Sequence, residues 1–94
     1  MLKKIIDVSA TWCGPCKAFK PTFEEVSKDK EFAKYLFSSV DVDTEEGETI
    51  SDVYGIRNVP TILFIDENNK EISRATGNLS KKEFCKKIIE ISDE

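Results

Sequence analysis

Apolar residues recur along the chain with the two periods that distinguish strands from amphipathic helices. Residues 3–9 form a short, mainly apolar run that predicts a buried strand, and the carboxylate of Asp7 lies inside this run. From residue 17 to about residue 28 the pattern is helical, with apolar side chains at Cys16, Phe19, Phe23 and Val26. The chain is therefore expected to begin with a strand that passes directly into a helix.

The remaining sequence continues this alternation of strands and helices. We expect a short helix or turn at 31–36, a strand at 37–43, a loop at 44–47, a helix at 48–54, a strand at 62–65, a hairpin turn at 67–70, a returning strand at 71–76 and a last helix from about 81. Ser80 and Glu83 fit a capping box that opens the last helix. A crossover would pair the first two strands in parallel and the hairpin would add the other two. The predicted fold is α/β, with a central mixed four-stranded sheet flanked by helices.

Length and composition favour a single small domain, residues 1–94. With 39% hydrophobic residues the chain can bury one modest core. The formal net charge is −4, and the basic residues are scattered rather than gathered along one face. This distribution argues against nucleic-acid binding, and we expect a monomer.

Membrane and export signals are not expected either. No apolar run approaches the roughly 20 residues that a helix needs to cross a bilayer. The first seven residues are too short and too soon interrupted by charge to act as a signal peptide. We therefore expect a cytoplasmic protein without a membrane partner.

The cysteine and histidine counts limit the possible chemistry. Three cysteines are too few for a disulfide scaffold and leave one unpaired. Without a histidine, the chain cannot assemble a Cys-His or Ser-His-Asp catalytic group. A tetrahedral zinc site requires about four Cys or His ligands, and the chain has only three cysteines. The thiols are therefore better candidates for redox chemistry than for metal binding.

Cys13 and Cys16 are separated by two residues, which lets them close a disulfide across one helical turn. They lie where the first strand passes into the first helix, and the positive end of that helix favours a thiolate. Cys13, at the helix start, gains most from this effect, whereas Cys16 lies one turn deeper. The alternative is an inert pair in the core. The flanking Trp12 and the position at a helix start argue against that alternative.

Two motifs resemble the active-site signatures of the thioredoxin family. Residues 12–17 have the sequence Trp-Cys-Gly-Pro-Cys-Lys, and residues 54–61 have the sequence Tyr-Gly-Ile-Arg-Asn-Val-Pro-Thr. The resemblance covers about residues 5–91 and implies a thioredoxin-like fold. Family members usually begin with an extra strand and helix, which this chain, starting at Met1, is too short to hold. Residues 37–43 would then form a sheet edge, whose acidic residues either discourage edge association or are simply common in the family.

The resemblance also implies a function and a set of site residues. The chain would be a thiol–disulfide oxidoreductase that reduces protein disulfides, with Cys13 attacking and Cys16 resolving, and it would need no cofactor or metal besides this redox-active disulfide. Its partners would be disulfide-containing substrate proteins and an electron donor similar to thioredoxin reductase, in electron transport and cell redox homeostasis. The family places a cis bond before the proline that is Pro60 here. Substrate would be recognised by a flat rim made of Trp12, Gly14, Pro15, Val59, Pro60 and Gly77.

Asp7 matches the position of the family's buried carboxylate, which is thought to relay a proton to and from the resolving cysteine. Burial in an apolar strand raises a carboxyl pKa, so Asp7 should titrate above its ordinary range. The family often has a lysine nearby, whose matching position is Ser39 here. Without that cation Asp7 would stay largely protonated near neutrality. The alternative is a purely structural, hydrogen-bonded carboxylate.

The sequence is also consistent with two further functions. One is a dedicated redox partner of a single reductase, peroxidase or relay, with specificity residing in residues 28–34 and 44–48. The other is a thioredoxin-fold subunit of a larger complex in which the cysteines play no part. In either case we expect Cys85 to be a spectator on the buried face of the last helix.

Overall fold

A mixed four-stranded sheet in the order β2-β1-β3-β4 lies at the centre of the molecule, in a computed structural model that describes residues 1–93. β1 pairs in parallel with β2, and β3 runs antiparallel to both β1 and β4. The elements are β1 (Leu2–Ser9), α1 (Gly14–Ser27), a 3-10 turn (Lys30–Phe32), β2 (Leu36–Asp41), α2 (Glu45–Tyr54), β3 (Thr61–Asp66), β4 (Glu71–Thr76) and α3 (Lys81–Ser92). The predicted α/β fold is confirmed, and β2 is an edge strand as expected.

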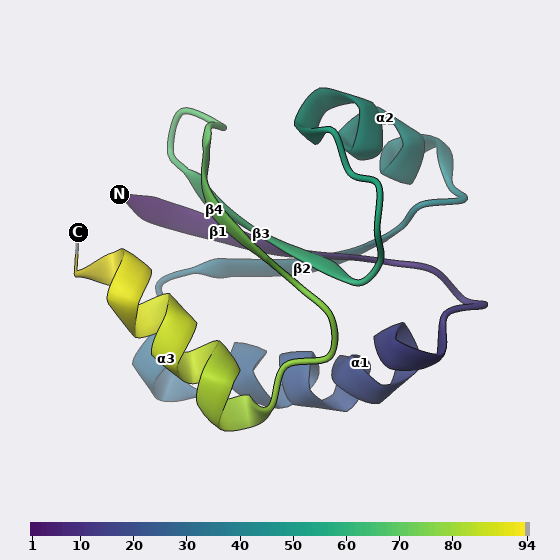
Figure 1. Cartoon of the computed structure of the whole chain (residues 1–94). Coiled ribbons are helices and arrows are strands. Elements are labelled where there is room, and N and C mark those ends of the chain that lie inside the picture. Colours follow the sequence, from purple (N-terminus) through teal and green to yellow (C-terminus); the bar gives the residue numbers. More distant parts are fainter. Residues whose placement is uncertain (94) are drawn as a thin grey trace.

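Helices cover both faces of this sheet, with α1 and α3 on one side and α2 on the other (Figure 1). Phenylalanine rings join α1 and α3 to the sheet. The ring of Phe84 in α3 lies 5.2 Å from that of Phe19 and 5.8 Å from that of Phe23, both in α1, measured between centroids. Such buried aromatic contacts fix the position of α1 relative to the sheet. They therefore also fix where its first turn lies.

β1 is buried because it has a strand on either side and helices on both faces. Successive side chains of a strand point to opposite faces, so Asp7 shares a face with Ile5, toward α1 and α3. Ile6 and Val8 point to the other face, where they pack beneath α2. The alternation of side chains along the strand thus places the carboxyl group of Asp7 in the core, where the residue is only 2% exposed.

Two local motifs predicted from the sequence are confirmed. The Ser80 hydroxyl accepts a hydrogen bond from the Glu83 N–H at 3.1 Å, and the Glu83 carboxylate accepts one from the Ser80 N–H at 2.9 Å, which completes the capping box of α3. In the hairpin between β3 and β4, Asn69 has a left-handed φ of 63°. Local side-chain chemistry therefore determines both the start of α3 and the turn between β3 and β4.

The loop predicted at 44–47 is wrong, because α2 begins at Glu45. The Thr44 hydroxyl caps this helix by accepting a hydrogen bond from the Gly47 N–H at 3.0 Å. Glu45 and Glu46 occupy the first turn, where negative charge interacts favourably with the helix dipole. Residues 45–47, predicted as part of a loop, therefore belong to the helix, and β2 ends earlier than predicted, at Asp41.

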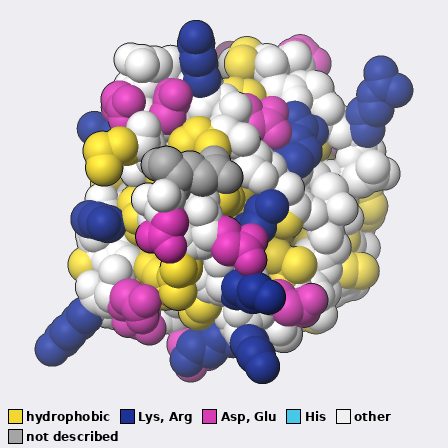
Figure 2. All heavy atoms as spheres, turned by 60° about the vertical axis from the view of Figure 1, so that its left-hand side comes forward, with side chains coloured by type: hydrophobic (Ala, Val, Ile, Leu, Met, Phe, Trp, Pro, Cys, Tyr) yellow, Lys and Arg dark blue, Asp and Glu magenta, His cyan; other side chains and the backbone are white. Residues whose placement is uncertain are grey.

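Charged side chains of both signs are interspersed on the face of the molecule shown in Figure 2. Lysine or arginine side chains there alternate with acidic ones rather than forming a stripe. Within residues 1–93, no helix is both long and apolar enough to cross a membrane.

Gly47 allows α2 to approach the end of β2. A Cβ atom placed on Gly47 would lie 1.8 Å from the Asp41 carbonyl oxygen and 2.7 Å from the Cα of Val42. These are backbone atoms and cannot rotate away. The approach brings the start of α2 beside the carboxyl end of β2, which is also where residues 41–43 approach the cysteine pair.

We predict that Gly47→Ala destabilises the protein by about 3 kcal/mol or more, because the added methyl group overlaps the β2 backbone. Urea unfolding of the reduced protein would measure the loss. Gly14→Ala is the matched control, since nothing lies within 4 Å of a Cβ at that position. Equal stability of the two variants would show that α2 does not pack as closely as described.

Candidate active site

Cys13 is the N-cap residue of α1, and its sulfur faces the first turn of the helix. The Cys16 N–H donates a hydrogen bond to Cys13 Sγ at 3.2 Å. Gly14 and Pro15 are the first helical residues, and the missing N–H of Pro15 costs nothing there. The helix therefore begins directly after Cys13, at the strand-to-helix turn where the sequence placed it. In the structure Cys13 and Cys16 are joined by a disulfide.

The two cysteine residues are largely buried, with 6% of Cys13 and 3% of Cys16 exposed. Their cluster includes Ala10 and is packed against Val42 and Val59. The N–H of Cys16 and the positive end of α1 both stabilise negative charge on the Cys13 sulfur. Cys16, inside the helix, is the less exposed of the two.

The segment around Pro60 meets the cysteine pair from the other side. The Val59-Pro60 bond is cis, as predicted, and the Val59 carbonyl oxygen lies 3.7 Å from Cys13 Sγ. The Gly77 N–H donates to the Pro60 carbonyl oxygen at 3.0 Å. Three segments that are far apart in sequence therefore meet around the disulfide, and they include the predicted site residues Cys13, Cys16, Val59, Pro60 and Gly77.

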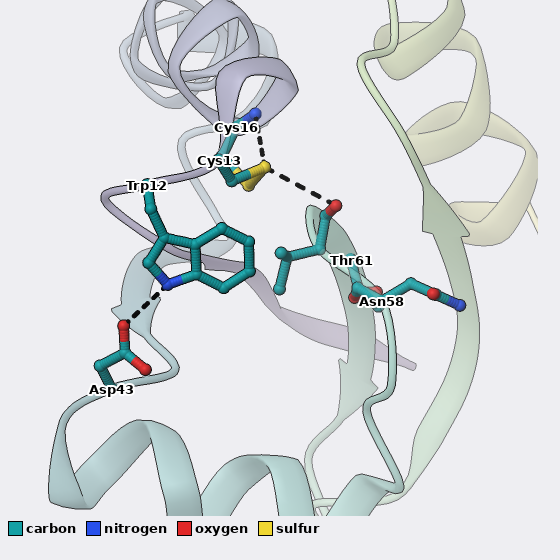
Figure 3. The surroundings of a disulfide bond; sticks show 7 residues. Trp12, Cys13, Cys16, Asp43, Asn58 and Thr61 are labelled. Carbon is teal, nitrogen blue, oxygen red and sulfur yellow. Dashed lines mark hydrogen bonds between the residues drawn. A yellow bond between two sulfur atoms is a disulfide. The ribbon is translucent and has the colours of Figure 1, made fainter.

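Trp12 covers one side of the site while remaining 67% exposed. Its indole N–H donates a hydrogen bond to Asp43 Oδ2 at 2.9 Å, as Figure 3 shows beside the cysteine pair. Our sequence reasoning did not assign Asp43 to the site. The sequence could have indicated this contact. Parallel strands end at the same edge of a sheet, so the residues that follow β2 lie near those that follow β1.

A groove of about 190 Å³ runs beside Trp12. It is lined by Trp12, Val42, Ser51, Ile56, Arg57 and Val59. Trp12 and Val59 were predicted site residues, and the groove adds side chains from α2 and from the segment that follows it. Gly14 and Pro15 are exposed on the first turn of α1.

Asp7 lies in the core of the sheet, with no hydrogen-bond partner for Oδ1 among the described residues. Burial raises the pKa of this carboxyl from 3.8 to about 6, and the positive charge of Lys20 opposes the rise. The expectation of a missing cation is wrong, because Lys20 supplies one from α1. A pKa of about 6 also leaves Asp7 mainly ionised at pH 7, rather than largely protonated.

Cys85 lies on α3, half-buried against the aromatic core. Burial raises the pKa of the Cys85 thiol, which disfavours the reactive thiolate. Within residues 1–93, no group of three or more His, Cys, Asp and Glu side chains is placed to hold a metal ion.

Comparisons of the sequence with protein families and with known proteins all point to thioredoxins. The family model described as Thioredoxin matches residues 2–90. A thioredoxin from Mycoplasmoides gallisepticum is 41% identical over 82 residues, covering 87% of this chain and 77% of that protein. A thioredoxin from Chlorobaculum thiosulfatiphilum is 37% identical over 86 residues, covering 92% of this chain and 76% of that protein.

Solved structures show the same similarity. The crystal structure of a thioredoxin from Malassezia sympodialis superposes with a TM-score of 0.82 at 37% sequence identity. The match covers 95% of this chain and 74% of the other. The arrangement of the sheet and its three helices is therefore shared with this solved structure.

The raised pKa of Asp7 makes stability depend on pH with a definite sign. Between pH 3.8 and about 6 the unfolded chain has lost a proton that the folded chain retains. The free energy of unfolding therefore falls as pH rises through this window and then levels off. At about 1.4 kcal/mol per pKa unit, the loss totals about 3 kcal/mol.

We therefore predict that Asp7→Asn is more stable than the unmodified protein at pH 7, by up to about 3 kcal/mol, with the difference vanishing near pH 3. Urea unfolding at both pH values would measure this, with the exposed Asp52→Asn as control. A variant that is destabilised equally at both pH values would instead indicate a structural, hydrogen-bonded carboxyl group.

Proposed function

Because the chain belongs to the thioredoxin family of thiol–disulfide oxidoreductases, we propose that it reduces disulfide bonds of other proteins by cycling Cys13 and Cys16 between dithiol and disulfide. The observation that carries this proposal is the placement of the Cys13 sulfur. It sits at the N-terminus of α1, accepts the Cys16 N–H, and lies against the Val59 carbonyl beneath an exposed Trp12.

The reaction takes place in two exchange steps. The Cys13 thiolate attacks one sulfur of the substrate disulfide, which releases the other substrate sulfur as a thiolate and forms a mixed disulfide. Cys16 then loses its proton and attacks the Cys13 sulfur. This step releases the second substrate thiolate and forms the Cys13–Cys16 disulfide, so two electrons have passed to the substrate.

Cys13 is assigned as the attacking residue because its surroundings favour negative charge. The Cys16 N–H and the end of α1 stabilise a thiolate at this sulfur, whereas Cys16 lies inside the helix. The small separation of the two residues suits rapid closure, since the helical turn already holds the sulfur atoms together.

Asp7 is proposed as the group that receives the proton of Cys16 and later returns it. Its pKa of about 6 keeps it mainly ionised at pH 7, yet close enough to neutrality to exchange a proton. The unpaired Oδ1 is free to accept that proton. Asp7 would thus serve the resolving step, in which Cys16 must become a thiolate.

Substrate recognition would depend on backbone groups and a small apolar surface. The carbonyl of Val59 faces the disulfide, and an extended substrate chain can lie along such an exposed backbone segment. Trp12, Gly14, Pro15, Pro60 and Gly77 would surround it, with the groove beside Trp12 receiving one substrate side chain. Because the site would contact few side chains of the substrate, it could bind many different substrate proteins.

The wider role follows from the same chemistry. The oxidised pair must be reduced again, so we propose an electron donor similar to thioredoxin reductase, and a part in electron transport and cell redox homeostasis. The redox group would be the Cys13–Cys16 pair itself, without a bound cofactor. A monomer acting in the cytoplasm would fit this role.

We predict that the protein accelerates the reduction of insulin by dithiothreitol, measured as turbidity from the released insulin chains. Cys13→Ser should abolish the acceleration, because the attacking thiolate is lost. Cys85→Ala, a change on α3 against the aromatic core, is the matched control and should retain it. If neither the unmodified protein nor the control accelerates reduction, a non-catalytic role for the fold would be favoured.

A further inference from the structure

The segment that joins α2 to β3, residues 55–60, forms one wall of the groove beside Trp12. It contributes Ile56, Arg57 and Val59 to the lining of that groove. The Val59 carbonyl oxygen also lies 3.7 Å from Cys13 Sγ. Neither a helix nor a strand covers residues 55–60, so the shape of this wall depends on how the two ends of the segment are held.

The end next to β3 is held by contacts of the sheet itself. The hydroxyl of the buried Thr61 donates a hydrogen bond to the Asn58 carbonyl oxygen at 2.6 Å, and Figure 3 shows both residues beside the cysteine pair. The Gly77 N–H, just after β4, holds the Pro60 carbonyl oxygen at 3.0 Å. These contacts fix residues 58–60 but leave residues 55–57 to be fixed from the side of α2.

The end next to α2 is held by Arg74, which reaches it from β4. α2 ends at Tyr54, and Gly55 has a left-handed φ of 63°, which turns the chain away from the helix axis. The last carbonyls of a helix have no partner within the helix, and Arg74 Nη2 donates a hydrogen bond to the Tyr54 carbonyl oxygen at 2.5 Å. A cation here also interacts favourably with the negative end of the helix dipole. Arg74 therefore ties the last turn of α2 to the sheet.

A bulge in β4 places a carboxylate beside this arginine. On a regular strand Glu71 and Arg74, three residues apart, would point to opposite faces of the sheet. Arg74 pairs with Leu63 on β3. The register then shifts, so that Glu71 pairs with Ile65. Both of these β3 residues pack beneath α2, so the two charged side chains share the face that α2 covers.

Glu71 fixes the orientation of the Arg74 guanidinium group. Glu71 Oε2 accepts a hydrogen bond from Arg74 Nε at 2.5 Å, and Oε1 accepts one from Nη2 at 2.6 Å. Two parallel hydrogen bonds hold the plane of a guanidinium group, which the ammonium group of a lysine cannot reproduce. The Nη2 atom is therefore aimed at the end of α2 before any substrate arrives.

We propose that Arg74 is a positioning residue for substrate binding. By fixing the end of α2 it holds Ile56 and Arg57 in the shape that receives a substrate chain, so that little ordering of the protein is needed on binding. The inference rests on the proposed reduction of protein disulfides, in which this groove contacts the substrate. Arg74 is not among the residues that line the groove and acts only through α2 and the segment after it.

The test compares a substrate that lies along the segment with one that does not. The first is an extended peptide with a single disulfide, and the second is hydroxyethyl disulfide, which has no peptide chain to lie along Val59. In Arg74→Met the KM for the peptide should rise about fivefold or more, because residues 55–57 must now be ordered on binding. The rate constant for hydroxyethyl disulfide should stay within about twofold, since the Cys16 N–H and the end of α1 still stabilise the Cys13 thiolate.

Two further variants separate positioning from loss of stability. Glu71→Gln keeps Arg74 but removes the charge that orients it, so the KM for the peptide should rise by a smaller factor. Lys81→Met is the matched control, because it removes an ion pair with Glu25 at 2.9 Å that joins α3 to α1. It should leave the kinetics with both disulfides unchanged.

Amide hydrogen exchange locates the effect in the structure. The Ile56 N–H donates a hydrogen bond to the Ser51 carbonyl oxygen at 2.9 Å, directly after the turn of α2 that Arg74 holds. Exchange at Ile56 should become faster in Arg74→Met and stay unchanged in Lys81→Met.

An unchanged KM for the peptide in folded Arg74→Met would overturn the positioning role, as would unaltered exchange at Ile56. An equal loss of rate with both disulfides would also overturn it, because the effect would then lie in the sulfur chemistry. If Arg74→Met does not fold, Glu71→Gln decides the question by the same KM measurement. If the unmodified protein reduces neither disulfide, the proposed function fails instead.

Discussion

The Cys16 N–H points at the Cys13 sulfur at 3.2 Å because Cys13 ends the loop after β1 and caps α1. This contact requires the first turn of α1 to lie at the edge of the sheet where the parallel strands β1 and β2 end. The helix is held there by phenylalanine rings from α1, α3 and β3 that pack into one core. The reactive geometry therefore depends on packing well away from the sulfur atoms.

The two cysteines face different surroundings, and this difference organises the site. Cys13 lies on the side of the Val59 carbonyl and the exposed Trp12, where another chain can approach. Cys16 lines a cavity between α1 and β2, together with the side chains of Lys17, Lys20 and Asp41. One side suits contact with substrate and the other suits proton movement. The buried carboxyl of Asp7, raised in pKa by burial, belongs to the second side.

Much of this arrangement could be predicted from sequence, because it depends on local pattern. The strand and helix periods gave the sheet, and the Cys-Gly-Pro-Cys turn gave the helix start and the redox pair. The start of α2 was misplaced although its Thr44 cap is a local signal, because Gly47 resembles a loop residue in sequence and its close approach to Asp41 depends on tertiary packing. Lys20 was missed for a related reason. Its action on Asp7 crosses between α1 and β1, which no pattern within one element reports.

The central claim is that Cys13 attacks substrate disulfides and Cys16 resolves the intermediate. Trapping tests it most directly: reduced Cys16→Ser would be mixed with a peptide that contains one disulfide, and the products mapped by mass spectrometry. Without the resolving thiol, the mixed disulfide should accumulate on Cys13, and it should be absent from the Cys13→Ser variant. Accumulation on Cys85, or no adduct at all, would contradict the account.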